Sequence, residues 1–280
     1  MRLTEPGAGS GATDSVGIPW AGRSFDHHPA GQHNSERGPE QSPVAEPAVT
    51  PDDGSADARL IDLLAGFRSG VVGEVQVVQM LRTVRLLVPL VAQLGESGLG
   101  EHGLVVDKSA ELSLVTVSGP DGRSVMPVFS SVEAMKRWKP LARPVPTDAV
   151  RMAVAAVGEG TQLVVLDPTS VTEFAIRGPA LRAIARSQPW LPSYLDGEIL
   201  EQFRAVALTE PAVVSLVLAP GDAAARLTGP ELVVQLNLLQ GLSETELAGL
   251  LQRLGEGWRS DAVIAERVDS LTVRLVAAKI

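Results

Sequence analysis

The feature that most constrains the fold is the stretch 111–138, where two strand-like segments flank a turn and lead into a helix. Apolar and polar residues alternate over residues 111–118, Gly-Pro-Asp-Gly occupies residues 119–122, and an apolar segment covers residues 124–129. Because strand side chains alternate between two faces and Gly and Pro favour a chain reversal, the pattern predicts an antiparallel hairpin. Pro127 lacks a main-chain donor, which predicts an edge strand or a bulge there.

The hairpin is followed by a predicted helix. Ser130 and Glu133 have the spacing of a capping box, in which a hydroxyl and a carboxylate bond the free amides of a helix start. Met135 and Trp138 then share one helix face, which we expect to pack over the hairpin.

Further elements follow from hydrophobic periodicity and helix-start signals. A second capping box, Ser243 with Glu246, opens a helix near the C-terminus, and Val150, Val154 and Val157 form the predicted buried stripe of an earlier one. Apart from the helices that start at Ser130 and Ser243, the predicted helices cover residues 57–67, 74–82, 147–157, 178–186 and 195–206. The other predicted strands cover residues 85–92, 162–167, 172–176, 212–219 and 232–238, with a final strand through Leu271, Val273 and Leu275. This order predicts an α+β fold with antiparallel-rich sheets.

Composition divides the chain into three segments. Residues 1–56 hold 8 Gly, 7 Pro and 6 Ser, with three arginines against eight acidic residues. Such a segment buries too little apolar surface to offset its ordering entropy, so we predict a disordered acidic tail. Prolines 189 and 192 mark a boundary between two small α+β domains, predicted at residues 57–192 and 193–280.

Charge and hydropathy exclude several classes of protein. The net charge is −9, and no segment has the positive excess that nucleic-acid binding favours. The longest apolar runs are far too short to cross a bilayer, and the start of the chain lacks the apolar region of a secretory signal. We therefore expect a cytoplasmic protein that does not bind membranes, and the charge as a whole does not favour nucleic acid as its partner.

Catalytic and cofactor motifs are scarce. The chain has no cysteine, and its histidines are His27, His28 and His33 in the tail and His102 in a Gly-rich loop. Residues 98–103 match G-x-G-x-x-G, but no helix follows, as a dinucleotide site requires. We expect no catalytic residues, cofactor or metal, and therefore no enzyme.

Two groups of residues could still form sites. A plain Asp-Pro-Thr-Ser turn is the simpler explanation of one strand end. The same turn could instead gather polar groups around a small ligand, and this candidate ligand site consists of Asp167, Thr169 and Ser170. An aromatic residue among cations could meet an anionic partner, or could be the exposed end of a helix whose Trp is buried; this candidate partner site consists of Arg137, Trp138 and Lys139.

The residues 125–138 (Val-Met-Pro-Val-Phe-Ser-Ser-Val-Glu-Ala-Met-Lys-Arg-Trp) resemble the signature of the SseB N-terminal domain. Residues 107–112 and 163–170 are also similar to that family, and its actinobacterial branch is the nearest likeness. The resemblance covers residues 57–188, and residues 195–280 more weakly resemble the companion C-terminal domain. The family has no established catalytic residues. Its name refers to enhanced serine sensitivity, sometimes linked to rhodanese-type sulfurtransferases, which need a cysteine that this chain lacks.

These observations lead to three hypotheses. The first is a non-enzymatic cytoplasmic binding or adaptor protein with an unknown protein partner. The alternative is a metabolite-binding regulator or enzyme that uses the Asp167–Ser170 turn. The third is a ribosome- or RNA-associated factor that binds through Arg137, Trp138 and Lys139.

Overall fold

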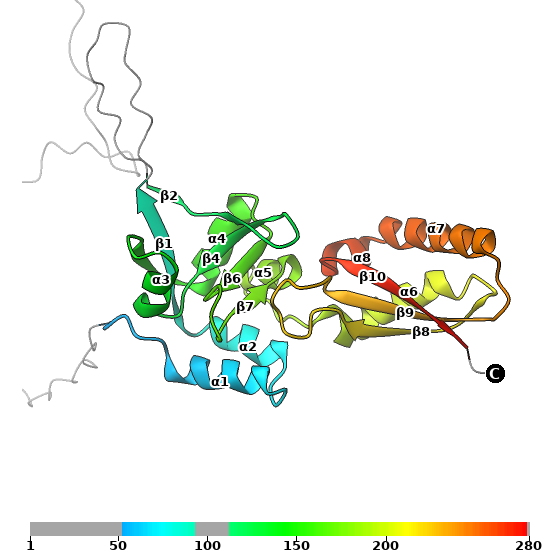
Figure 1. Cartoon of the computed structure of the whole chain (residues 1–280), viewed down its shortest axis with the longest axis horizontal. Coiled ribbons are helices and arrows are strands. Elements are labelled where there is room, and N and C mark those ends of the chain that lie inside the picture. Colours follow the sequence, from blue (N-terminus) through cyan, green and yellow to red (C-terminus); the bar gives the residue numbers. More distant parts are fainter. Residues whose placement is uncertain (1–51, 93–111, 279–280) are drawn as a thin grey trace, which may run out of the picture. The chain divides into compact units, whose positions relative to one another are not determined.

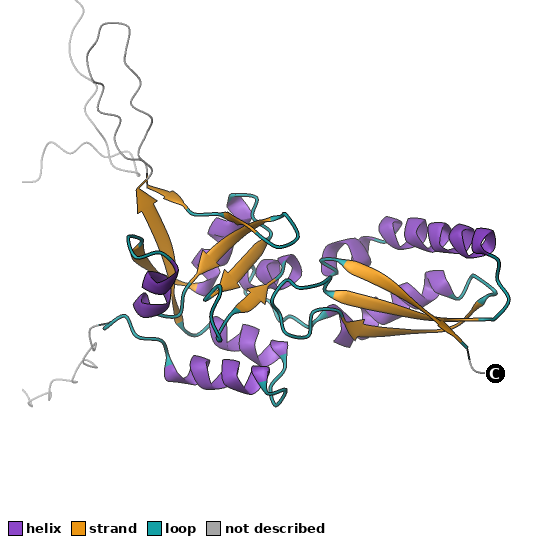
Figure 2. Ribbon diagram, viewed as in Figure 1, coloured by secondary structure: helices purple, strands orange, loops and turns teal. Residues whose placement is uncertain are grey.

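The computed structural model describes residues 52–92 and 112–278 of the chain, and within them the fold is α+β, as predicted (Figures 1 and 2). The helices are α1 (Ala58–Arg68), α2 (Glu74–Leu81), α3 (Val132–Trp138), α4 (Ala149–Gly158), α5 (Gly178–Ala185), the 3-10 turn η1 (Ser193–Leu195), α6 (Gly197–Ala207), α7 (Glu244–Ser260) and α8 (Ala262–Arg267). The strands are β1 (Arg85–Ala92), β2 (Leu112–Leu114), β3 (Val117–Ser118), β4 (Ser124–Val128), β5 (Arg143–Asp148), β6 (Leu163–Leu166), β7 (Phe174–Ile176), β8 (Val213–Pro220), β9 (Leu232–Leu238) and β10 (Leu271–Ala277). The predicted tail up to residue 51, the Gly-rich motif and the four histidines lie outside the described residues.

Two sheets form in the first part of the chain, with strand orders β2-β1-β5 and β3-β4-β6-β7. The predicted hairpin is much shorter than expected, because only β3 pairs with β4, whereas residues 112–114 pair antiparallel with β1. Alternation predicts a strand but does not select its partner, and β1 offers a long apolar edge. The strand β5 was not predicted; residues 143–148 pair with β1 instead of leading directly into a helix.

Pro127 lies in β4, which is an interior strand of its sheet. Its neighbour β6 runs parallel to it from Val125 to Val128, but β3 pairs only with Ser124 and Val125. At Pro127 one side of the strand therefore has no ladder partner, so the missing N–H costs little. The predicted edge character is correct for this position but not for the strand as a whole.

The core of the first part combines α1, α2, α4 and α5 with β1, β4, β6 and β7. The predicted stripe of α4 is wrong, since Val154 and Val157 are 55% and 47% exposed. The buried side is instead lined by Ala149, Met152, Ala153 and Ala156. Apart from Arg151 this helix is almost entirely apolar, so periodicity allowed two stripes, and the small alanines allow the closer approach to neighbouring elements.

The last part of the chain is a three-stranded sheet of order β10-β9-β8, with β8 antiparallel and β10 parallel to β9. Helices α6, α7 and α8 pack against alternate residues of β9 (Leu232, Val234, Leu236, Leu238), and hence on one face, as predicted (Figure 2). The capping box of Ser243 and Glu246 is confirmed. The helix α8 was not predicted.

The buried residues of the two parts form separate clusters, except that Ala225 and Leu227 of the β8–β9 loop belong to clusters of the first part. The domain boundary at residues 192/193 stays a prediction. Among the described residues, the structure contains no helix long and apolar enough to cross a membrane.

Candidate functional site

The candidate ligand site is built around Asp167, which follows β6. Its φ is 45°, and the side chain turns back into the protein, where the residue is only 1% exposed. Ser130 donates its main-chain N–H to Oδ1 (2.8 Å) and its hydroxyl to Oδ2 (2.7 Å). Thr172 donates its hydroxyl to Oδ2 (2.9 Å). Burial raises the pKa of Asp167, although these hydrogen bonds oppose the shift.

These contacts correct the predicted helix cap. Ser131, not Ser130, caps α3, and its hydroxyl accepts the N–H of Ala134 (3.1 Å). Ser130 is 3% exposed, and its N–H and hydroxyl donate to Asp167 instead. Two adjacent serines satisfy the same sequence rule, and only the position of Asp167 decides between them.

A cavity of about 450 Å³ opens over this carboxylate. It brings together Asp167 and Ser170 from the candidate ligand site and Arg137 from the candidate partner site. Its polar lining is completed by Asp53, Ser55, Ser130, Ser131, Glu133 and Thr172. Thr169 does not line it, since its N–H donates to Glu173 (2.5 Å) and its side chain is exposed. The structure therefore brings Asp167 and Ser170 together at this cavity and places Thr169 outside its lining, and ligand binding there stays a prediction.

Several polar groups of this cavity are already bonded to one another. The Asp167 carboxylate already accepts three hydrogen bonds, so it is poorly placed to remove a proton from a ligand. The hydroxyls of Ser170 and Thr172 lie 2.8 Å apart and bond each other. Arg137 lies 3.7 Å from Glu133, and both are exposed. The cavity therefore offers hydroxyls and exposed charges to a polar ligand.

The candidate partner site is split by packing. The Trp138 ring lies 5.4 Å from the ring of Phe129 and joins a small core with Leu87 and Met135. Met135 and Trp138 thus share a face, as predicted, and they pack on Phe129 at the end of the predicted hairpin segment and on Leu87 of β1. Arg137 and Lys139 are exposed. The ring is therefore not presented beside the two cations.

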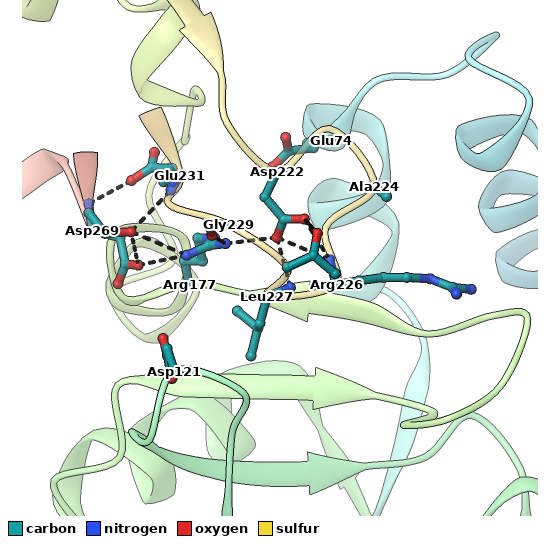
Figure 3. A network of polar contacts seen from close by, with 12 residues as sticks. Glu74, Asp121, Arg177, Asp222, Ala224, Arg226, Leu227, Gly229, Glu231 and Asp269 are labelled. Carbon is teal, nitrogen blue, oxygen red and sulfur yellow. Dashed lines mark hydrogen bonds and ion pairs between the residues drawn. The ribbon is translucent and has the colours of Figure 1, made fainter. Parts of the chain in front are cut away.

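A second polar cluster was missed by the sequence analysis (Figure 3). The buried guanidinium of Arg177 donates to Asp222 (2.7 Å) and Asp269 (3.0 Å), and Arg123 donates both Nη atoms to Asp269 (2.9 Å each). Burial alone would raise the pKa of Asp269, but the two arginines outweigh it and lower that pKa. The main-chain N–H groups of Arg226 and Leu227 also donate to Asp222. These residues are far apart in sequence, so no local pattern joins them. The one sequence signal is Arg177, a charged residue directly after the apolar strand β7.

Two further carboxylates lie near this cluster. Glu231 accepts the N–H of Asp269 (2.6 Å), and Glu74 accepts the hydroxyl of Tyr194 (3.2 Å). Burial raises the pKa of Glu74 to about 7, the Tyr194 hydrogen bond opposes this shift, and nearby Glu231 adds to it. Since the arginines and aspartates of the cluster bond each other, the cluster holds together segments that are distant in sequence.

The family model described as SseB protein N-terminal domain matches residues 60–183. This stretch runs from α1 into α5 and contains the Asp167 cavity apart from residues 53–56. No curated protein and no solved structure matches the chain.

Proposed function

Because residues 60–183 are an SseB N-terminal domain, the chain belongs to the SseB family, and we propose that it is a non-enzymatic binding or adaptor protein. The observation that carries this proposal is the apolar surface on both edge strands of the β10-β9-β8 sheet. Val217 on β8 is 50% exposed, and Leu275 and Val276 on β10 are 39% and 38% exposed. Exposed apolar edge strands invite pairing with another chain, and proteins usually blunt them with charge or proline.

The chemistry of the Asp167 cavity supports the same proposal. The buried carboxylate of Asp167 accepts hydrogen bonds from Ser130 and Thr172, so it has a structural role in holding the start of α3. We assign the protein to the cytoplasm as part of the proposal, and fractionation of cells that express the tagged chain tests this location.

A pull-down tests the adaptor function. We expect the immobilised chain to capture a protein that Val217→Lys or Val276→Lys no longer retains. The matched control is Val71→Lys, since Val71 is 83% exposed and lies between α1 and α2. Capture that is equal for all three variants contradicts the assignment to the sheet. Turnover of a small molecule by the purified chain, abolished by one substitution in the described residues, contradicts the non-enzymatic function.

The second candidate function is a metabolite-binding regulator, favoured by the cavity that joins Asp167, Ser170 and Arg137. A thermal-shift screen with amino acids, nucleotides and sulfur metabolites tests it. We expect a true ligand to lose its stabilising effect in Ser170→Ala and Arg137→Gln, but not in Arg151→Gln, whose arginine is exposed on α4. A screen without any stabilising compound removes this candidate.

The third hypothesis, RNA association through Arg137, Trp138 and Lys139, has less support because Trp138 packs on Phe129. A filter-binding titration at low salt tests it, since binding through cations weakens steeply as salt is added.

A further inference from the structure

An apolar groove lies between α7, α8 and the start of β10. It has a volume of about 540 Å³ and is lined by Leu251, Gly255, Trp258, Ile264, Val268 and Leu271. A Cβ built on Gly255 would meet only the guanidinium of Arg259, at 3.9 Å. The absence of a side chain at Gly255 therefore keeps this part of the helix surface open.

Exposed apolar side chains continue from the groove along β10. Leu271, Val273 and Leu275 pair with Leu232, Val234 and Leu236, so they share the face that the helices cover. Leu271 and Leu275 nevertheless remain 36% and 39% exposed. The helices thus cover this edge of the sheet only partly, and its apolar side chains can accept further contacts.

The main chain of β10 is free on its outer side. Leu232 donates its N–H to Ser270 O (3.0 Å), and Ala278 donates its N–H to Leu238 O (2.8 Å). In a parallel ladder both polar groups of one residue face the same neighbour, and those of the next residue face away. The N–H and C=O groups that point away from β9 are therefore those of Leu271, Val273, Leu275 and Ala277. Within residues 52–92 and 112–278, no strand pairs with that side.

The positive charge at the groove indicates which kind of partner fits it. Arg259 lines it, and its Nε donates to the carbonyl of Gly255 (3.0 Å). Among the described residues no carboxylate forms an ion pair with Arg259, whereas Asp269, the acid in the lining, is bonded by Arg123 and Arg177. The groove therefore complements an apolar segment that carries an acidic residue.

We infer that β10 takes an extended acidic-apolar peptide of a partner protein as an added strand. The peptide places alternate apolar side chains in the groove and a carboxylate on Arg259. Main-chain hydrogen bonds to an edge strand supply affinity, and the pocket for alternate side chains supplies specificity. This inference rests on the proposed binding function and names the chemistry of its partner.

The first experiment blocks the groove. The probe is a fluorescein-labelled peptide of alternating leucine and threonine that ends in glutamate, and its anisotropy is followed as full-length chain is added. We expect saturable binding that Gly255→Leu weakens by at least about tenfold, since the new side chain occupies the apolar pocket. Leucine favours a helix more than glycine, so this variant should fold. Ala248→Leu, exposed on the same helix, should bind as the parent chain does.

The second experiment separates main-chain pairing from side-chain contact. Leu275→Pro and Leu275→Ala both remove the leucine, but only proline removes the N–H that points away from β9. We expect Leu275→Pro to bind the probe roughly two- to tenfold more weakly than Leu275→Ala, the effect of one hydrogen bond. Arg259→Gln should weaken the glutamate probe roughly two- to fivefold, as for an exposed ion pair, and leave a glutamine-ended probe unchanged.

Three results overturn the inference. In the first, the parent chain does not bind the probe saturably. In the second, the parent chain and Gly255→Leu bind it equally. In the third, sedimentation shows a dimer of the chain that Gly255→Leu dissociates. The last result would assign the groove to a second copy of the chain. If the pull-down partner is retained by Gly255→Leu but lost in Val217→Lys, the groove inference fails while the adaptor function stands.

Discussion

Replacing Glu74 by glutamine should change how the stability of the protein depends on pH. The side chain of Glu74 is largely buried beside Tyr194, and its pKa rises from 4.5 to about 7 on folding. An acid with a raised pKa binds a proton more tightly when folded. Its contribution to stability is therefore complete below pH 4.5 and is lost as the pH rises to 7.

The magnitude follows from the two pKa values. Each pH unit between 4.5 and 7 is worth about 1.4 kcal/mol, so the ionised side chain lowers the free energy of unfolding by roughly 3 kcal/mol above pH 7. Glutamine keeps the acceptor for the Tyr194 hydroxyl and carries no charge. We expect Glu74→Gln to be about 3 kcal/mol more stable than the parent chain at pH 8 and equally stable near pH 4.5.

Urea unfolding followed by tryptophan fluorescence, at several pH values between 4.5 and 8.5, measures this difference. Glu159→Gln is the matched control, because Glu159 is exposed at the end of α4, and its curve should follow that of the parent chain. A constant difference between Glu74→Gln and the parent at every pH would refute the assignment of this titration to Glu74. If Glu74→Gln were less stable than the parent chain at pH 8, the predicted direction of the effect would be wrong.

Four other substitutions, at three positions, test the packing, each by urea unfolding at neutral pH. Asp167→Ala should cost about 3 kcal/mol because it leaves the buried N–H of Ser130 without an acceptor, and Asp167→Asn should cost less because an amide oxygen can replace Oδ1. Gly221→Ala should cost about 2 kcal/mol, since its Cβ would lie 2.3 Å from the carbonyl oxygen of Pro230. Ser243→Ala should cost about 1 kcal/mol through loss of the α7 cap.

Local patterns in the sequence determined most elements. The start of α7 was predictable because Ser243 and Glu246 satisfy amides within one turn, with no other part of the chain involved. The helix α5 was predictable for the same reason, since proline favours its first turn. The turn after β6 was also located, and with it Asp167 and Ser170 of the candidate site.

Tertiary structure decided which partner each element found. Residues 112–114 pair with β1 and not with the nearby β4, because strand pairing depends on which edges are free. Val154 and Val157 face solvent because the alanine side of α4 packs more closely. The sequence determined where the chain could form helices, strands and caps, since these depend on neighbours within a few residues. The Arg177 cluster, the Asp167 cavity and the groove beside β10 each join residues distant in sequence, so they exist only once the chain has folded.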